Sequence, residues 1–536
     1  MWKKLLITGC MAFCLLGGSV LSAQPSCETK EEVTSEQLNR TKKGLDAMMK
    51  ELKNNSWYQS ELNKVASLAT PSEQMQAYKS LAGRLISVLE IQAELEWMKP
   101  EAIQEALGIM KKSSGFDANL AEKRFSELKS LLAGGFAGIY TGDQQALDKA
   151  NKALALKREL MLMSPDVNVD KMLTVKFNLG ERANFVGAGS LGIQPNNWSN
   201  LSSASRKNFK AELVELSGLK SGNLQEKTVY KPAVEGSSVT DLVLNWDGKR
   251  LMVKALDTTR RWQVHEINLE GGNARQVTNI PEPDLEFFDA TYLPDGRMLA
   301  ISNIGYQGVP CVNGSDAVGN MVLYDPSNGD LRRLTFDQDA NWHPVVMANG
   351  KVMYVRWEYT DLTHYFSRIV MHMNPDGTEQ KSLYGSGSMF PNSIFDVQPL
   401  PKRTNRFVGV ISGHHGVARS GRLMIFDPAK SRKEEKGMIQ ELPFRGRPII
   451  PEVKDELVND VWPQFIKPYP LTDETFLVTA KLSPYSRWGI YLVDIYDNLT
   501  LVANADDAGM IYSVPVKSTP VPPAIPDRIK PNEKEA

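Results

Sequence analysis

The sequence predicts a mainly β protein, a β-propeller of about six blades preceded by an α-helical bundle. Turns of the type Asp-Gly or Asn-Gly recur at positions 247, 295 and 349, each between two apolar strands. A spacing of about fifty residues is typical of a propeller blade. A second hairpin follows these turns, so one repeat holds about four strands. Upstream of residue 164, apolar residues recur instead at helical spacing.

The helical region is predicted to span residues 28–164. It opens with a capping box at Thr34–Gln37, and Thr70–Glu73 is a second helix start with proline at the first helical position. Further helices are expected after Pro100, Asp117 and Gly142. The pattern predicts a bundle of about five or six helices with one apolar face.

The sequence changes character at Ser164-Pro165, and the propeller is predicted over residues 165–515. Regular repeats and less regular units together give about six blades. These segments are Leu242–Lys254, Ala290–Ser302, Val345–Arg356, Leu173–Tyr230, Arg406–Asp427 and Thr475–Val502. Residues 516–536 are rich in proline and are expected to form an extended, linker-like tail.

Charge excludes one class of partner. The chain has 62 basic and 63 acidic side chains, and its formal net charge of -1 provides no overall field that would attract nucleic acid. We therefore expect no nucleic-acid partner. With 42% hydrophobic residues the chain is expected to fold rather than to stay disordered.

The first residues predict export. Lys3 and Lys4 precede an uncharged, apolar stretch, Leu5–Leu21, which is followed by the small residues Ser22 and Ala23. Residues 1–23 are interpreted as a signal peptide rather than an uncleaved anchor, because the stretch is short for a membrane span. The mature protein is expected in the periplasm or at the cell surface.

The cysteines indicate no disulfide framework. Cys10 and Cys14 lie in the signal, which leaves only Cys27 and Cys311 in the mature chain. Ile7–Cys10 is similar to a bacterial lipobox but comes early, and Cys27 is poorly placed for the same role. A lipid anchor stays an open alternative, and membrane contact is expected only through such an anchor.

Cofactor motifs are absent or incomplete. Gly187–Gly192 matches the dinucleotide fingerprint as a string, but Gln194-Pro195 follows where a helix should start, so we interpret the segment as a loop. The chain has 6 histidines and no Cys-x-x-Cys-His, which excludes covalent c-type haem. No cofactor is predicted, and a bound metal ion stays open.

His414 and His415 are the first pair of candidate site residues. They lie in Ser412–Gly416, after the strand Phe407–Ile411, where an imidazole could act as a base or bind a metal ion. Adjacent strand residues point to opposite faces, so both cannot easily serve one ion. Packing or loop hydrogen bonding is the favoured interpretation.

The segment Arg356–Asp361 supplies the other candidates, Glu358 and Asp361. It combines acids, a cation and aromatic side chains, as a binding surface does. A strand with alternating faces followed by a charged turn accounts for it equally simply and is preferred. Trp342-His343-Pro344 is likewise interpreted as blade packing rather than a substrate platform.

From about Val169 to Asp527 the chain resembles one known family, and five strings carry the resemblance. They are Tyr354–Asp361, Met373–Thr378, Tyr384-Gly385 with Phe390–Asn392, Ser412–Gly416 and Ile525–Arg528. On these strings the chain resembles the propeller middle domain of the hydrazine synthase alpha subunit and its haem-free bacterial relatives. The Asp-Gly hairpins alone would indicate only a TolB-like propeller. The resemblance implies the fold, but it transfers no haem residue and no hydrazine synthesis to this chain.

We therefore expect an exported, non-catalytic binding or scaffold protein whose propeller presents a surface to a protein or glycan ligand. The alternative is a periplasmic hydrolase or metal-dependent lyase. It would use His414 or His415 at the propeller channel, near Glu358 and Asp361. Propellers host both kinds of function, so the fold alone does not decide between them.

Overall fold

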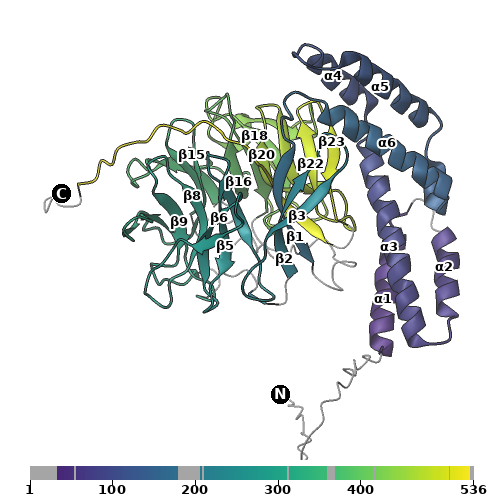
Figure 1. Ribbon diagram of the computed structural model, residues 1–536, viewed down its shortest axis with the longest axis horizontal. Coiled ribbons are helices and arrows are strands. Elements are labelled where there is room, and N and C mark those ends of the chain that lie inside the picture. Colours follow the sequence, from purple (N-terminus) through teal and green to yellow (C-terminus); the bar gives the residue numbers. More distant parts are fainter. Residues whose placement is uncertain are drawn as a thin grey trace, which may run out of the picture.

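A computed structural model describes residues 33–52, 56–178, 206–207, 210–310, 313–358, 368–413, 417–505 and 508–530. Helices come first and strands follow (Figure 1). The last α-helix ends at Leu162 and the first strand begins at Lys171.

The described N-terminal residues form a helical part. Its elements are α1 (Ser35–Met49), α2 (Ser56–Ala66), α3 (Pro71–Glu96), α4 (Pro100–Met110), α5 (Ala118–Ala133), the 3-10 helix η1 (Ala137–Thr141) and α6 (Gln144–Leu162). The predicted capping box at Thr34 is present, and the predicted helix start at Thr70 has a capping box as well. Leu45, Tyr58 and Leu85 share the core between the first three helices. None of these helices, within the described residues, has the length and hydropathy that crossing a bilayer requires.

The described β-rich part consists almost entirely of antiparallel sheets, four with four strands and one with eight. The eight-stranded sheet consists of two four-stranded halves, β12–β15 and β16–β19, which meet at a parallel bridge between Arg368 and Ser393. The units whose four strands are consecutive in the chain therefore contain the two hairpins that the repeat predicts.

The units have the following strands. The first combines β1 (Lys171–Asn178), β2 (Lys210–Ser217) and β3 (Gln225–Tyr230) with β24 (Gly509–Pro515). The next two are β4 (Thr240–Leu244), β5 (Arg250–Leu256), β6 (Trp262–Asn268) and β7 (Ala274–Gln276), then β8 (Phe287–Tyr292), β9 (Met298–Ser302), β10 (Asn320–Tyr324) and β11 (Leu331–Arg333).

The later units follow the same order. They are β12 (Asn341–Val346), β13 (Val352–Trp357), β14 (Arg368–Met373) and β15 (Lys381–Tyr384), then β16 (Ser393–Pro399), β17 (Phe407–Ser412), β18 (Arg422–Phe426) and β19 (Met438–Leu442). The last is β20 (Gln464–Pro470), β21 (Thr475–Lys481), β22 (Gly489–Asp494) and β23 (Leu499–Ala503), and the 3-10 helix η5 (Glu434–Gly437) precedes β19.

One strand of each unit contacts its counterparts in a closed cycle, and we call these the inner strands. β4 contacts β8, β8 contacts β12, and the series continues through β16, β20 and β24 back to β4. β24 comes from the end of the β-rich part and pairs with β1 from its start. Four-stranded sheets arranged around an axis are the architecture of a β-propeller, so the prediction of a mainly β fold of the propeller type is confirmed.

The predicted turns are also present. Gly248, Gly296 and Gly350 have φ angles of 72°, 92° and 81°, a left-handed conformation that glycine adopts without steric cost. The sequence signal was specific because the turn type demands this residue.

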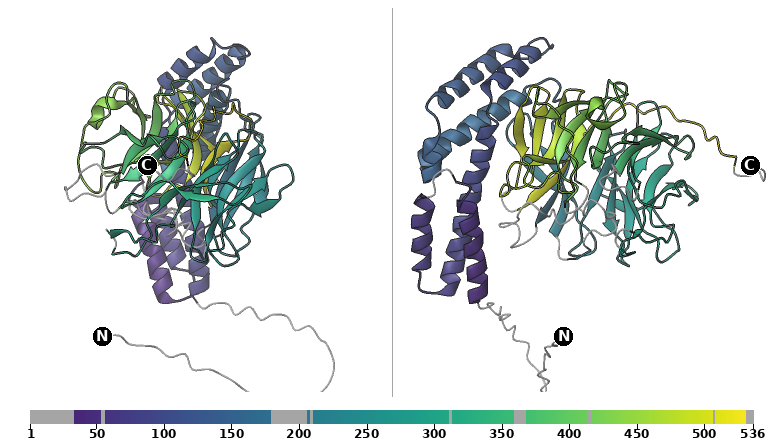
Figure 2. Two further views of the ribbon diagram at one scale, coloured as in Figure 1. Left: turned by 90° about the vertical axis from the view of Figure 1, so that its left-hand side faces the viewer. Right: turned by 180° about the vertical axis from the view of Figure 1, so that it is seen from behind.

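The helical part packs along one side of the unit β20–β23 (Figure 2). Lys157 on α6 is buried and donates to Leu499 O at 2.7 Å. Arg487 donates from Nε to the carboxylate of Glu90 on α3 at 2.8 Å. Apolar packing and buried polar contacts together therefore hold the two parts against each other.

The C-terminal segment is extended, as its prolines predict, but residues 516–530 are not a free linker. Thr519 N–H donates to Trp246 O at 2.9 Å. Asp527 accepts two hydrogen bonds from Arg297, at 2.7 and 2.8 Å. Figure 1 shows the segment in yellow, passing over the β-rich part beside β15. It is therefore anchored to the propeller.

Candidate functional site

Polar side chains gather on the axis where the inner strands meet. Each inner strand carries one non-glycine residue with a positive φ, between 49° and 72°, at an irregularity in its pairing. We call these residues the channel ring: Asp241, Asp289, His343, Asp396, Lys467 and Tyr512. Left-handed backbone is costly for such residues and persists only where the surroundings enforce it.

The bulges direct backbone N–H groups at the ring residue of the preceding unit. Asp289 N–H donates to Asp241 Oδ2 at 3.0 Å, and His343 N–H donates to Asp289 Oδ2 at 2.6 Å. Lys467 N–H donates to Asp396 Oδ2 at 3.0 Å. A side chain of one unit thus holds the strained backbone of the next.

The link between the first and the second unit has the same form. Asp241 N–H donates to the Tyr512 hydroxyl at 2.8 Å, and that hydroxyl lies 3.3 Å from Asp241 Oδ1. Burial raises the pKa of Tyr512 well above its usual value, so the hydroxyl keeps its proton. This contact joins β24, late in the chain, to β4.

His343 bridges two carboxylates from the neighbouring units. Its Nδ1 lies 3.0 Å from Asp289 Oδ1, and its Nε2 lies 3.0 Å from Asp396 Oδ1. Burial disfavours the charged imidazole, but the two carboxylates outweigh it and raise the pKa of His343. The imidazolium in turn overcomes the effect of burial on Asp289 and lowers the pKa of that carboxyl to about 2. His343 is therefore a cation held between units.

Further cations balance the ring carboxylates. Lys467 Nζ lies 2.7 Å from Asp396 Oδ1, and Lys254 Nζ lies 3.8 Å from Asp241 Oδ2. Arg419 is 1% exposed, and burial lowers its pKa to about 10 against the attraction of the ring carboxylates. These cations and His343 together offset the negative charge of the three ring carboxylates.

A cavity of about 100 Å³ adjoins the ring. Its lining continues along the inner strands through residues such as Pro344, Gln398, Tyr469 and Ser513. The space suits a few water molecules or a small polar ligand rather than a large substrate.

Buried arginines stack on tryptophans near the beginning of the inner strands. Arg419 lies 4.5 Å from the ring centroid of Trp342, and Arg368 lies 4.4 Å from that of Trp357. The two indoles stack on each other with centroids 6.1 Å apart. Trp342 is fully buried, which confirms its interpretation as blade packing.

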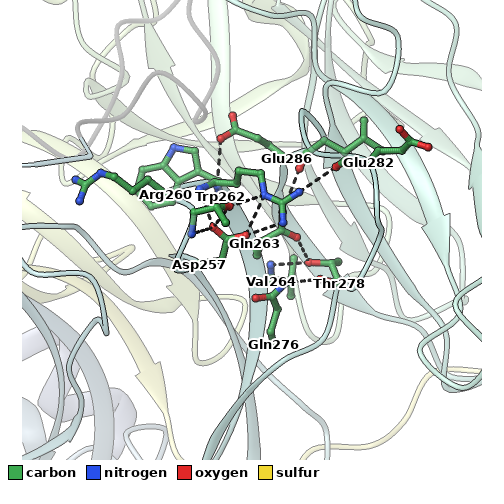
Figure 3. Close-up of polar contacts among 12 residues, drawn as sticks. Asp257, Arg260, Trp262, Gln263, Val264, Gln276, Thr278, Glu282 and Glu286 are labelled. Carbon is green, nitrogen blue, oxygen red and sulfur yellow. Dashed lines mark hydrogen bonds and ion pairs between the residues drawn. The ribbon is translucent and has the colours of Figure 1, made fainter.

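Glu286 connects the second and third units near the same end (Figure 3). Its carboxylate accepts the Trp262 N–H at 3.1 Å and a guanidinium N–H of Arg206 at 2.8 Å. Close by, Gln263 Nε2 donates to Leu285 O at 3.1 Å. The Glu286 carboxylate therefore holds neighbouring segments together through hydrogen bonds.

Among the predicted site residues, the structure describes Glu358. Glu358 follows β13 and forms an ion pair with Arg356, whose guanidinium also lies 3.5 Å from Asp337 Oδ1. The Glu358 carboxylate is thus paired with a residue of the strand that it follows. His414, His415 and Asp361 lie outside the described residues, as do Gly187–Gly192, Cys27 and Cys311.

The channel ring was missed from the sequence, although a signal for part of it exists. Asp241, Asp289 and His343 each stand six positions before the first residue of the predicted turn, at 241 and 247, 289 and 295, and 343 and 349. A polar residue repeated at one register of an inner strand points toward the axis of a propeller. His343 stands in the string Trp342-His343-Pro344, for which the sequence favours blade packing.

Within the described part of the chain, no group of three or more His, Cys, Asp or Glu side chains is arranged to hold a metal ion.

No protein-family model and no curated protein matches the sequence. Among solved structures, hydrazine synthase from Kuenenia stuttgartiensis is similar, with a TM-score of 0.49 and 13% identity over 67% of this chain and 48% of that chain. TolB from Acinetobacter baumannii has a TM-score of 0.41 and 11% identity, covering 68% and 71%. An oligogalacturonate lyase in complex with manganese has a TM-score of 0.35 and 11% identity, covering 53% and 85%. The chain thus matches about half the length of the hydrazine synthase chain.

Proposed function

We propose that this chain is an exported, non-catalytic binding or scaffold protein built on a six-bladed propeller. The four four-stranded sheets and the two halves of the eight-stranded sheet would be the blades. The ligand would be a protein or a glycan.

One observation carries this proposal: the ionisable groups of the channel ring are used to pair with one another. The carboxylates of Asp289 and Asp396 both contact His343, and Asp396 also contacts Lys467. A general base must be able to exchange its proton with a substrate. An imidazolium enclosed by two buried carboxylates is instead suited to holding the blades in register.

The binding surface is proposed on the face where the inner strands begin. Tyr306 follows β9, whose last residue pairs with the start of β8, and Phe336 precedes β12. Their side chains are 62% and 73% exposed, which is unusual for aromatic residues. Exposed aromatic side chains of this kind are enriched at sites of protein recognition.

The proposal is tested with the purified full chain and isolated envelope fractions, namely polysaccharide and solubilised protein. We expect saturable binding that a Tyr306→Ala, Phe336→Ala double variant weakens at least tenfold, with the recovered ligand chemically unchanged. Leu120→Ala, at an apolar residue of α5 that is 38% exposed and lies in the helical part, is the control and should bind like the wild type.

The alternative enzyme would give a different outcome in the same samples. Turnover of a polysaccharide fraction, or a stoichiometric metal ion that is lost in His415→Ala, would contradict the proposal and support a hydrolase or lyase.

A further inference from the structure

The C-terminal segment 516–530 contacts several hairpin turns on one face of the propeller. These turns are Asp247-Gly248, Asp295-Gly296-Arg297, Asn349-Gly350 and Asp376-Gly377, and together we call them the hairpin surface. All four connect strands within units, so they lie at the opposite end of the inner strands from Tyr306 and Phe336.

Two glycines make room for the backbone of the segment. A Cβ placed on Gly248 would lie 2.8 Å from the carbonyl carbon of Lys517, and one on Gly350 would overlap the carbonyl oxygen of Pro523. Gly296, in the equivalent turn between them, has no such neighbour within 4 Å. Close approach of another backbone is a second reason for glycine beyond its φ.

Charged groups fix the end of the segment. Arg297 binds both carboxylate oxygens of Asp527, at 2.7 and 2.8 Å, the bidentate geometry that gives arginine its specificity for carboxylates. One residue later, Arg528 N–H donates to Asp376 Oδ2 at 2.6 Å, and its guanidinium forms an ion pair with Glu379. Asp376 itself is 1% exposed.

The resulting set of contacts is that of a peptide-recognition site. Prolines hold the segment extended before it binds, which lowers the entropy lost on docking. Gly350 leaves room for the backbone of the segment. Arg297 binds the acidic side chain, and Asp376 accepts a hydrogen bond from the backbone N–H of the next residue. Side-chain selection at Asp527 would make recognition specific for the pattern Pro-Asp-Arg.

We propose that the hairpin surface is a binding site for an extended, proline-containing peptide with an Asp-Arg pair, and that the chain's own residues 519–530 occupy it. Since a tethered segment competes at an effective concentration on the order of millimolar, a partner peptide would bind only when the resident segment is displaced. The site is distinct from the proposed ligand surface at the other end of the inner strands.

The test uses a fluorescent peptide with the sequence of residues 519–530. It is added to the full-length wild type and to a full-length Asp527→Ala, Arg528→Ala variant, in which the resident segment loses its anchors while the hairpin surface is unchanged. Fluorescence anisotropy should show binding to the variant at least tenfold tighter than to the wild type. A peptide carrying Asn in place of Asp527 should bind the variant at least tenfold more weakly than the native peptide does.

Hydrogen exchange of the resident segment accompanies the titration. We expect less protection of the backbone amide of residue 528 in the double variant than in the wild type, since that amide is hydrogen-bonded to Asp376 in the docked state. Equal peptide affinity for the two proteins, unchanged exchange in the variant, or no binding to a variant whose segment is released would each overturn the proposal.

Discussion

Asp289 and His343 come from different units of the propeller and contact each other twice. The carboxylate accepts the backbone N–H of His343 at 2.6 Å, and its other oxygen lies 3.0 Å from the imidazole Nδ1. The same carboxylate thus stabilises both a left-handed backbone and a buried positive charge. Neighbouring blades are therefore held together by charge at the axis as well as by apolar packing.

His343→Gln is expected to reduce the free energy of unfolding by about 3–5 kcal/mol, because it leaves two buried carboxylates without their shared cation. The measurement is urea denaturation of the full chain followed by circular dichroism. His372→Gln is the control, since that imidazole lies on β14 and burial lowers its pKa. Similar losses in both variants would contradict a special role for His343.

The loss in His343→Gln is expected to depend on pH. The raised pKa of folded His343 means that its stabilisation is complete below the unfolded value of 6.5 and is lost as pH rises through the folded value. The lowered pKa of Asp289 has the opposite consequence: its stabilisation is present above 3.8 and is lost as pH falls toward about 2. The difference between variant and wild type should therefore be largest between about pH 4 and 6.5.

Two ion pairs between the helical part and the propeller differ in burial. In Arg487–Glu90 the side chains are 17% and 11% exposed, whereas in Arg445–Glu105 they are 43% and 42% exposed. Arg487→Ala is expected to cost about 3 kcal/mol or more, because the buried carboxylate loses its partner. Arg445→Ala should cost at most about 1 kcal/mol. The measurement is the melting temperature of each variant. Equal decreases in the two melting temperatures would show that burial does not control how much each ion pair stabilises the fold.

Local signals explain what the sequence could predict. A capping box at Thr70, a glycine at Gly350 and helical spacing in α3 each depend on a few neighbouring residues, so they can be read without the fold. The repeat of such turns then predicts blades, because each unit must pack against the next.

The channel ring could not be derived in the same way. Simple alternation along a strand assigns faces by parity, but a bulge at Asp289 or Lys467 changes which way the following residues point. Contacts such as Tyr512 with Asp241 join residues far apart in the chain. Only the closed cycle of inner strands brings them together, and no local pattern specifies that closure.

Glu94 lies on α3, and its charge acts on the buried Tyr491 of β22 across the junction of the helical part with the propeller. Burial and the nearby Glu90 raise the pKa of Glu94 to about 8, against the attraction of cations that include Lys157, Arg158 and Arg487. The folded chain therefore binds a proton that the unfolded chain releases between pH 4.5 and about 8, so this group makes stability fall as pH rises.

Glu94→Gln should remove that fall. Relative to the wild type, the variant should be more stable by less than about 1 kcal/mol at pH 5 and by on the order of 4 kcal/mol at pH 8. Urea midpoints at the two pH values test this, with the exposed Glu101→Gln as the control. A variant that is equally destabilised at both pH values would contradict the assigned pKa.

Two glycines in equivalent turns have similar backbone conformations, but only one of them contacts the docked segment. Gly350 and Gly296 have φ angles of 81° and 92°, so alanine at either position should cost about 1–2 kcal/mol through backbone strain. Only at position 350 would the added methyl group also overlap the docked segment, at Pro523. Gly350→Ala should therefore speed hydrogen exchange and tryptic cleavage within residues 519–530, whereas Gly296→Ala should leave both close to the wild-type rate. If the two variants release the segment equally, strain in the turns rather than contact with the segment controls its docking.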